Sequence, residues 1–173
     1  MPPSQSAVIV AVPEAEAAVA SWRIRLDPSA AWGVPAHVTV LYPFLPPDEI
    51  DGPALAEVAA AVRAVPAFDV RFERTAWFGE KVLWLDPGPS APFRALTTQV
   101  WQRFPQCVPY DGAHAELIAH LTVGDGAPVA DLRSADRAVG AALPIWARVS
   151  HARLICGSME PDSWRTMTEF PLG

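Results

Sequence analysis

The chain has few cysteines, no long apolar run and no recognisable secretory signal. Cys107 and Cys156 are too few for a disulfide framework, and this favours a reducing compartment. Apolar runs such as AVIVAV fall far short of the ~20 residues that a membrane span needs. The first residues, MPPSQS, lack the basic flank and the small-residue cleavage site of a signal peptide. We therefore expect a cytoplasmic protein that does not enter a membrane.

The chain also lacks an excess of positive charge. It carries 13 Lys and Arg against 19 Asp and Glu, which gives a net charge of −6. Proteins that coat long nucleic acids usually present a basic face, because the neutralisation of phosphates drives their affinity. An acidic chain can still hold one phosphate in a favourable pocket. The composition therefore argues against an extended RNA or DNA platform, and it leaves open a nucleotide or a terminal phosphate as the partner.

What the chain does have is enough apolar residues, 51% of 173, to bury one core of ordinary size. Hydrophobic periodicity predicts alternating strands and helices. The predicted strands cover residues 6–12, 37–42, 67–78, 81–87, 116–123, 144–156 and 163–172. The predicted helices cover residues 13–27, 48–65, 90–104 and 129–143.

The two halves of the chain follow the same order of elements. Residues 6–79 and 80–171 each read strand, helix, histidine-bearing strand, helix, long strand. The step after the second helix is similar even in detail, with VPAFDVRF in the first half and LPIWARVS in the second. We predict one domain over residues 1–173, of the α/β class in its α+β form, with two pseudo-symmetric lobes.

A histidine stands two residues before a threonine in both histidine-bearing strands, in the segments VPAHVTVLYPF and LIAHLTVGDG. Side chains at i and i+2 share one face of a strand, so His37 lies beside Thr39, and His120 beside Thr122. The residues between and after them are apolar and face the other way. An approximate two-fold axis between the halves brings the two polar faces together across a cleft.

Two imidazoles and two hydroxyls around one small space suit a phosphate ester. One neutral histidine can take a proton from water while the other, protonated, gives one to the leaving oxygen. Each threonine hydroxyl can donate a hydrogen bond to a phosphate oxygen. Zinc sites normally take three or four protein ligands, and neither motif brings a further Cys, His or Glu at ligand spacing. We therefore expect no metal ion and no cofactor.

On these two motifs the chain resembles the two-histidine (2H) phosphoesterases, which include bacterial 2′-5′ RNA ligase-like proteins and cyclic nucleotide phosphodiesterases. HVTV and HLTV match the family pattern His-x-Thr/Ser-x, and the likeness in element order and motif spacing covers essentially the whole chain. The resemblance implies a small, mostly antiparallel sheet in each lobe, with helices packed outside and a central cleft. It implies that His37 and His120 are acid and base, and that Thr39 and Thr122 bind phosphate.

A tyrosine follows the first motif at a position that some cyclic phosphodiesterases of the family share. Their tyrosine lies five residues after a catalytic histidine, near the phosphate, and Tyr42 has this position after His37. Strict alternation points Tyr42 away from the cleft, so a substrate contact requires the strand to bend near Pro43. The second motif has GDG in place of LYP, so only one lobe can supply such a tyrosine.

The function implied is a metal-independent phosphodiesterase, which we expect to be monomeric. It would hydrolyse a 2′,3′-cyclic phosphate, or a related 2′-5′ or cyclic phosphodiester, in a nucleotide or at an RNA end. Ligation is the reverse reaction on the same residues, and bulk water favours ring opening. Two alternatives stay open: a non-catalytic module that binds nucleotides or RNA ends, and a structural domain in which His37 and His120 lie far apart.

The remaining histidines and cysteines carry weaker expectations. His114 and His151 lack a threonine two residues later and are expected to be structural or solvated. Cys107 has no visible paired base, so we expect a packed or loop thiol instead of a nucleophile.

Some aromatic and basic residues are further candidates for the cleft. Trp32 and Tyr110 could border it and stack on a base, although core packing is the commoner role. Arg25, Arg94 and Arg148 could contact phosphate, with surface solvation as the simpler interpretation.

Overall fold

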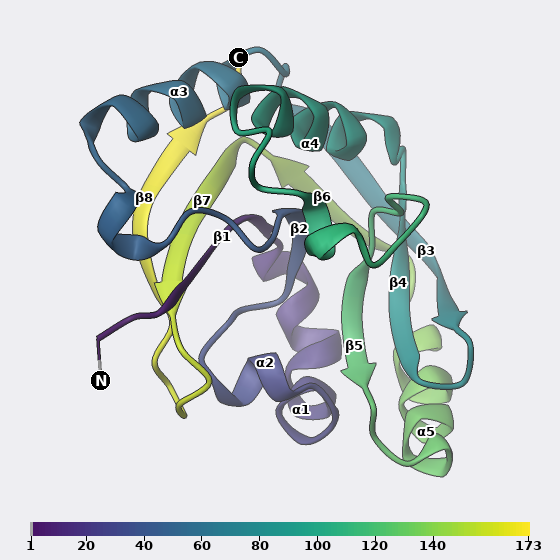
Figure 1. Cartoon of the computed structure of the whole chain (residues 1–173). Coiled ribbons are helices and arrows are strands. Elements are labelled where there is room, and N and C mark those ends of the chain that lie inside the picture. Colours follow the sequence, from purple (N-terminus) through teal and green to yellow (C-terminus); the bar gives the residue numbers. More distant parts are fainter. Residues whose placement is uncertain (1) are drawn as a thin grey trace.

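A single antiparallel sheet organises the protein, which is described here over residues 2–173 of a computed structural model (Figure 1). The strands are β1 (Gln5–Ala11), β2 (His37–Leu41), β3 (Phe68–Phe78), β4 (Val82–Gly88), β5 (Leu121–Asp125), β6 (Ile145–Val149), β7 (His151–Gly157) and β8 (Arg165–Pro171). The helices are α1 (Glu16–Leu26), α2 (Pro28–Ala31), α3 (Gly52–Arg63), α4 (Ala91–Arg103) and α5 (Val129–Gly140).

The sheet consists of two halves that meet between β2 and β5. Its strand order is β6-β3-β4-β5-β2-β1-β7-β8. β2 and β5 pair at one position only, Val38 opposite Leu121. We call β2, β1, β7 and β8 the β2 half, and β5, β4, β3 and β6 the β5 half. The predicted α+β class with two pseudo-symmetric lobes is confirmed.

The halves of the sheet do not coincide with the halves of the chain, residues 6–79 and 80–171. β3 belongs to the first half of the chain but pairs with β4 and β6 in the β5 half. β7 belongs to the second half of the chain but pairs with β1 in the β2 half. The first half of the chain therefore gives β3 to the β5 half, the second half gives β7 and β8 to the β2 half, and neither lobe is a continuous segment.

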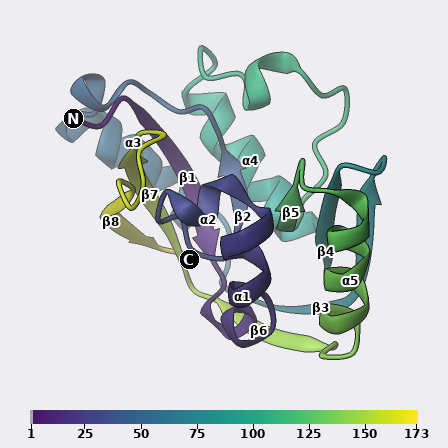
Figure 2. The same ribbon diagram turned by 90° about the horizontal axis from the view of Figure 1, so that it is seen from below.

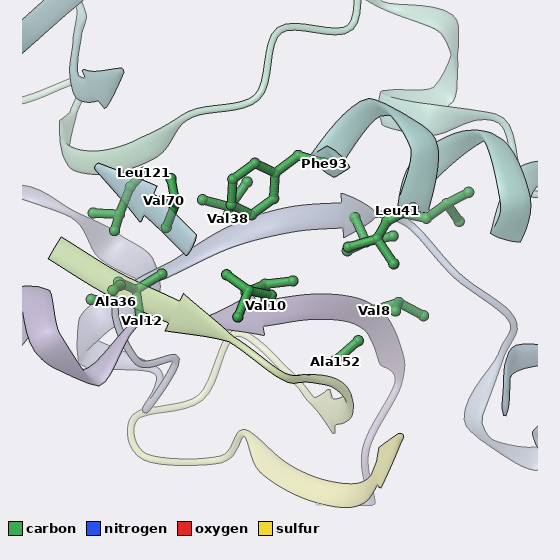
Figure 3. Packing of buried hydrophobic residues seen from close by; sticks show 14 of the residues in the cluster. Val8, Val10, Val12, Ala36, Val38, Leu41, Val70, Phe93, Leu121 and Ala152 are labelled. Carbon is green, nitrogen blue, oxygen red and sulfur yellow. The ribbon is translucent and has the colours of Figure 1, made fainter. Parts of the chain in front are cut away.

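One face of the sheet is apolar and covered by helices. Val8 and Val10 of β1 and Val38 of β2 point into a single core that includes residues of α1, α3, α4 and α5 (Figure 3). α3 and α4 lie toward one end of the strands and α1 and α5 toward the other (Figure 1), with α1 packed on β5 and α5 on β3 and β4 (Figure 2). Alternation places the intervening side chains on the opposite face, where a smaller apolar cluster includes Ile9 and Trp164 and where polar side chains of the central strands line a cavity.

Two predicted strands differ from the structure. The predicted strand 116–123 begins only at Leu121, because the segment of β4 that pairs with β5 ends at Leu85. The predicted strand 144–156 is broken at Ser150, where the chain passes from β6 in one half of the sheet to β7 in the other.

The predicted helix over residues 13–27 is also divided. Residues Pro13–Ala15 form a 3-10 turn before α1, and α1 ends before Asp27, whose side chain caps α2 by accepting from the Ser29 amide. Within residues 2–173, none of the helices combines the length and the apolar character needed to cross a bilayer.

Candidate active site

The open face of the sheet holds a cavity of about 240 Å³ where the two halves meet. All five residues singled out by the sequence line it: His37, Thr39, Tyr42, His120 and Thr122. The alternative in which the two motifs face apart is therefore wrong. The motifs lie together because β2 and β5 are neighbours at the centre of the sheet.

Strand alternation sorts each motif into a cavity side and a core side. On β2, Val38 and Val40 are buried in the core, while His37 and Thr39 are only partly buried on the other face. On β5, Leu121 and Val123 take the core side, and Thr122 faces the cavity. The apolar residues of each motif thus anchor the strand, and the polar residues are free to contact a ligand.

The two histidine rings are oriented by the same hydrogen bond. Nδ1 of His37 lies 2.7 Å from the carbonyl oxygen of Pro35, and Nδ1 of His120 lies 2.7 Å from that of Ile118. A carbonyl oxygen can only accept, so Nδ1 carries the hydrogen in both rings. Nε2 of each neutral ring is then the acceptor, and it is the nitrogen that can exchange a proton with a ligand.

Burial lowers the pKa of both imidazoles, but to different degrees. Burial, followed by the nearby Arg23 guanidinium, lowers the pKa of His37 to about 4. Burial also lowers the pKa of His120, where it is opposed mainly by the bond to the Ile118 carbonyl. His37 is therefore the weaker base of the two and the one more firmly held in its neutral form.

A buried ion pair lies behind His37 at the junction of α1 and α2. Arg23 is 2% exposed, and its Nη2 donates to Asp27 Oδ2 at 2.9 Å while its Nη1 donates to the Val34 carbonyl at 3.1 Å. Ser29 donates to the same carboxylate through its hydroxyl and its amide. These bonds tie the junction to the segment that enters β2. Asp27 and Ser29 also line the cavity.

Both motif strands carry a bulge at the residue after the threonine. On β2, Thr39 pairs with Ile9 and Leu41 with Val8, so Val40 has no partner on β1. On β5, Thr122 pairs with Trp84 and Gly124 with Leu83, so Val123 has none on β4. An extra residue resets the alternation of side chains. The pseudo-symmetry of the two motif strands therefore includes the bulge, which the pairing of the strands does not itself require.

The bulge on β2 explains why Tyr42 faces the cavity. It places Leu41 in the core and Tyr42 on the open side, where its hydroxyl donates to Gln5 Oε1 at 3.2 Å. The change of face occurs at Val40, before the bend that we expected near Pro43.

On β5 the same shift brings Asp125 to the position equivalent to Tyr42, and Asp125 also lines the cavity. Gly124 replaces Leu41 there because α1 and α5 close over it. A Cβ at Gly124 would lie 2.5 Å from a methyl of Leu132.

Tyr110 connects the two motifs from the loop before β5. Its amide donates to the Tyr42 carbonyl at 2.6 Å, and its side chain lines the cavity together with Thr39. Its ring lies 6.4 Å from that of His120 at an interplanar angle of 29°. Tyr110 and Asp111 both have positive φ, 50° and 51°, a left-handed conformation that costs non-glycine residues free energy. The surrounding contacts hold this strained turn so that the phenol reaches Thr39.

The other candidates divide between cavity and surface. Trp32 lines the cavity together with Trp164, which the sequence did not single out. The three arginines do not line it: Arg25 lies over the Trp22 ring, Arg94 donates to Ser90 and Arg148 to Asp69.

The remaining histidines and Cys107 also lie outside the cavity. His114 is exposed and its ring contacts Tyr110, and His151 is exposed beside Ser150. Cys107 is buried, and burial raises the pKa of its thiol. In the described part of the chain, no three side chains of His, Cys, Asp or Glu are grouped closely enough to hold a metal ion.

Comparison with known proteins agrees with this geometry. The family model of the 2′-5′ RNA ligase superfamily matches residues 11–156. LigT of E. coli in its apo form is similar with a TM-score of 0.61 and 16% identity over 98% of both chains. LigT complexed with 3′-AMP is similar with a TM-score of 0.61 and 14% identity over 98% of both chains.

A third solved structure, TT0787 of Thermus thermophilus, gives a TM-score of 0.66 and 19% identity over 96% of this chain and 97% of its own. At such identities the likeness shows the fold. No curated protein matches the sequence.

Proposed function

Because the chain belongs to the 2′-5′ RNA ligase superfamily, whose model covers residues 11–156, we propose that it is a metal-independent phosphodiesterase of the 2H type. The resemblance inferred from the two motifs is confirmed at the level of the family. The proposed reaction is hydrolysis of a 2′,3′-cyclic phosphate, or of a related 2′-5′ or cyclic phosphodiester. The observation that carries the proposal is the pair of equally oriented histidines, each beside a threonine, around one cavity.

The two histidines have the properties of a general base and a general acid. His37, with its pKa of about 4, is neutral at physiological pH and suits the base. It takes a proton from water as the water oxygen bonds to phosphorus. In its protonated form, His120 gives the proton on Nε2 to the ribose oxygen as the P–O bond breaks, and the product is a phosphomonoester. Each such proton transfer typically contributes ~10²–10⁴-fold.

The threonines and the tyrosine hydroxyl supply neutral donors for the phosphate. Thr39 and Thr122 follow the two histidines on the cavity face, and each can donate to a non-bridging oxygen. Tyr110 lines the same cavity beside Thr39, and its hydroxyl is a further neutral donor. Fixed donors of this kind stabilise developing charge without reorganising during the reaction.

A nucleotide is the proposed substrate class. Trp32 and Trp164 line the same cavity as the histidines and offer flat apolar surfaces. LigT, which shares the fold, was solved with 3′-AMP bound. The cavity of about 240 Å³ suits a nucleotide or the last residue of an RNA strand better than a long duplex.

The proposal is tested by hydrolysis of 2′,3′-cyclic nucleotides, and of a short RNA ending in a cyclic phosphate, in the presence of EDTA. We expect turnover by the wild type and a loss of at least ~10²-fold in His37→Ala and in His120→Ala. His151→Ala, which changes an exposed histidine outside the cavity, serves as the matched control.

Three outcomes of this assay would contradict the proposal in different ways. Activity that survives both substitutions would overturn the assignment of the two histidines. Activity that EDTA abolishes would overturn the metal independence. Tight nucleotide binding without turnover on any substrate would favour the non-catalytic binding module.

A further inference from the structure

The cavity differs sharply at its two equivalent positions. Tyr42 and Asp125 each lie five residues after a motif histidine in the sequence, and the two bulges turn both side chains toward the cavity. One position offers a phenol and the other a carboxylate. Asp125 also lies near Asp27, since both line the cavity and a neighbouring surface pocket beyond the α1–α2 junction. The β5 side of the cavity is therefore rich in acceptors.

The cavity wall carries little positive charge to balance the carboxylates of Asp27 and Asp125. Among the described residues that line the cavity, none is lysine or arginine. Arg23 is buried and already bound to Asp27 at 2.9 Å. Arg153, beside Ile9 on the same face, is held by Glu169 at 2.7 Å. Asp125 thus contributes a negative charge to the cavity wall. His120 and Lys81 offset this charge only in part, since burial together with Asp27 still raises the pKa of its carboxyl group.

We propose that Asp125 makes the cavity selective for a phosphodiester that carries no second phosphate. This inference rests on the proposed function and narrows its substrate. A nucleoside 2′,3′-cyclic phosphate with a free 5′-hydroxyl is preferred over the same nucleotide with a 5′-phosphate. The carboxylate accepts a hydrogen bond from a hydroxyl or an amine, whereas it repels a second phosphate. The RNA end, with its additional phosphate, is then a poorer substrate than the mononucleotide.

The expected size of the effect is modest because Asp125 is exposed to solvent. Two like charges several ångströms apart at a wet surface are partly screened, so we expect discrimination of about fivefold at low ionic strength. The preference should shrink as salt is added, since screening acts on this repulsion more strongly than on contacts inside the cavity.

The experiment compares kcat/KM for adenosine 2′,3′-cyclic phosphate with kcat/KM for its 5′-phosphorylated form. In the wild type the first value exceeds the second by about fivefold. Asp125→Asn brings the ratio close to one by raising activity on the 5′-phosphorylated substrate, and Asp125→Glu keeps the preference. Asp48→Asn, which removes an exposed carboxylate outside the cavity wall, leaves the ratio unchanged.

Failure of this inference can be told apart from failure of the proposed function. Equal turnover of both substrates by the wild type, or an unchanged ratio in Asp125→Asn, overturns the role of Asp125 and leaves the phosphodiesterase in place. If neither substrate is turned over, the proposed function fails. The selectivity is then tested by calorimetric measurement of the affinities for 3′-AMP and adenosine 3′,5′-bisphosphate. Weaker binding of the bisphosphate supports the role of Asp125, and equal affinities overturn it.

Discussion

His37 and His120 make the same hydrogen bond to the backbone but have different surroundings. Both rings donate from Nδ1 to the carbonyl two residues earlier, both precede a threonine on the cavity face, and both strands bulge after that threonine. His37 lies near the buried Arg23–Asp27 pair. His120 lies among aromatic rings, with its ring centroid 5.1 Å from that of Phe78 and 5.9 Å from that of Trp84.

This difference shows how a repeated geometry can serve two unlike tasks. The strand, the ring orientation and the bulge are set by the backbone, so they persist in both lobes although the two sequences differ. The charge nearby is set by side chains from other elements, and these are not repeated. Burial lowers the pKa of both histidines, and Arg23 lowers that of His37 further, whereas no arginine acts in this way on His120. A pair with unequal pKa values is what acid and base catalysis requires.

The largest expected effect comes from removing both histidines at once. Each alanine variant loses at least ~10²-fold in kcat/KM, because one step needs both proton transfers. The double variant His37→Ala/His120→Ala should then be only a few-fold slower than the weaker single variant. Steady-state rates on a 2′,3′-cyclic nucleotide check this. Multiplication of the two losses would mean that the histidines act in separate steps.

The pH profile tests the difference between the two histidines directly. If His37 is the base, kcat/KM needs it deprotonated, which its pKa of about 4 ensures down to acidic pH. If His120 is the acid, kcat/KM falls as pH rises through its pKa, which lies below the ordinary 6.5. We therefore expect an optimum below pH 6.5 and a loss approaching tenfold per unit above it. An optimum above pH 7 would contradict this assignment.

The two threonines should differ in their coupling to Tyr110. Thr39→Val and Thr122→Val each remove one hydroxyl donor to the phosphate, and we expect a loss of about tenfold for each. Because the Tyr110 side chain acts at Thr39 in the cavity wall, adding Tyr110→Phe to Thr39→Val should cost little more, while adding it to Thr122→Val should multiply the losses. Equal behaviour in the two cycles would show that Tyr110 does not act through Thr39.

The smallest expected effect concerns Tyr42. Tyr42→Phe keeps the ring on the cavity wall and removes only the hydroxyl that donates to Gln5. We expect a change of about twofold in KM and less than about 1 kcal/mol in the free energy of unfolding. Substrate saturation curves and denaturant titration check both. A loss of kcat comparable to that of Thr39→Val would indicate that the phenol contacts the phosphate itself.

The sequence was sufficient for the parts of the site that follow local patterns. Period-2 alternation places His37 beside Thr39, and His120 beside Thr122, without any knowledge of the fold. Helical periodicity locates α3, α4 and α5 within a few residues. The pairing of the two motifs across one cavity followed from the repeated order of elements.

The features that escaped the sequence depend on pairing between distant strands. The bulges at Val40 and Val123 exist only relative to β1 and β4. The contact predicted for Tyr42 was therefore attributed to a bend near Pro43, and Asp125 was not considered. Tyr110 lies in a left-handed turn in which two non-glycine residues, Tyr110 and Asp111, precede Gly112, so the one glycine does not mark where the left-handed backbone begins. The Arg23–Asp27 pair, spaced i and i+4 at the end of α1, was the one visible clue to the buried charge beside His37.

The exchange of strands between the lobes has a consequence for synthesis on the ribosome. β1 lies between β2 and β7, so the half of the sheet that holds His37 stays incomplete until residues 151–171 have been made. β2 and β5, which carry the two motifs, emerge earlier and must wait for these last strands. A nascent chain therefore has both histidines well before it has β7 and β8, which complete the half of the sheet that holds His37.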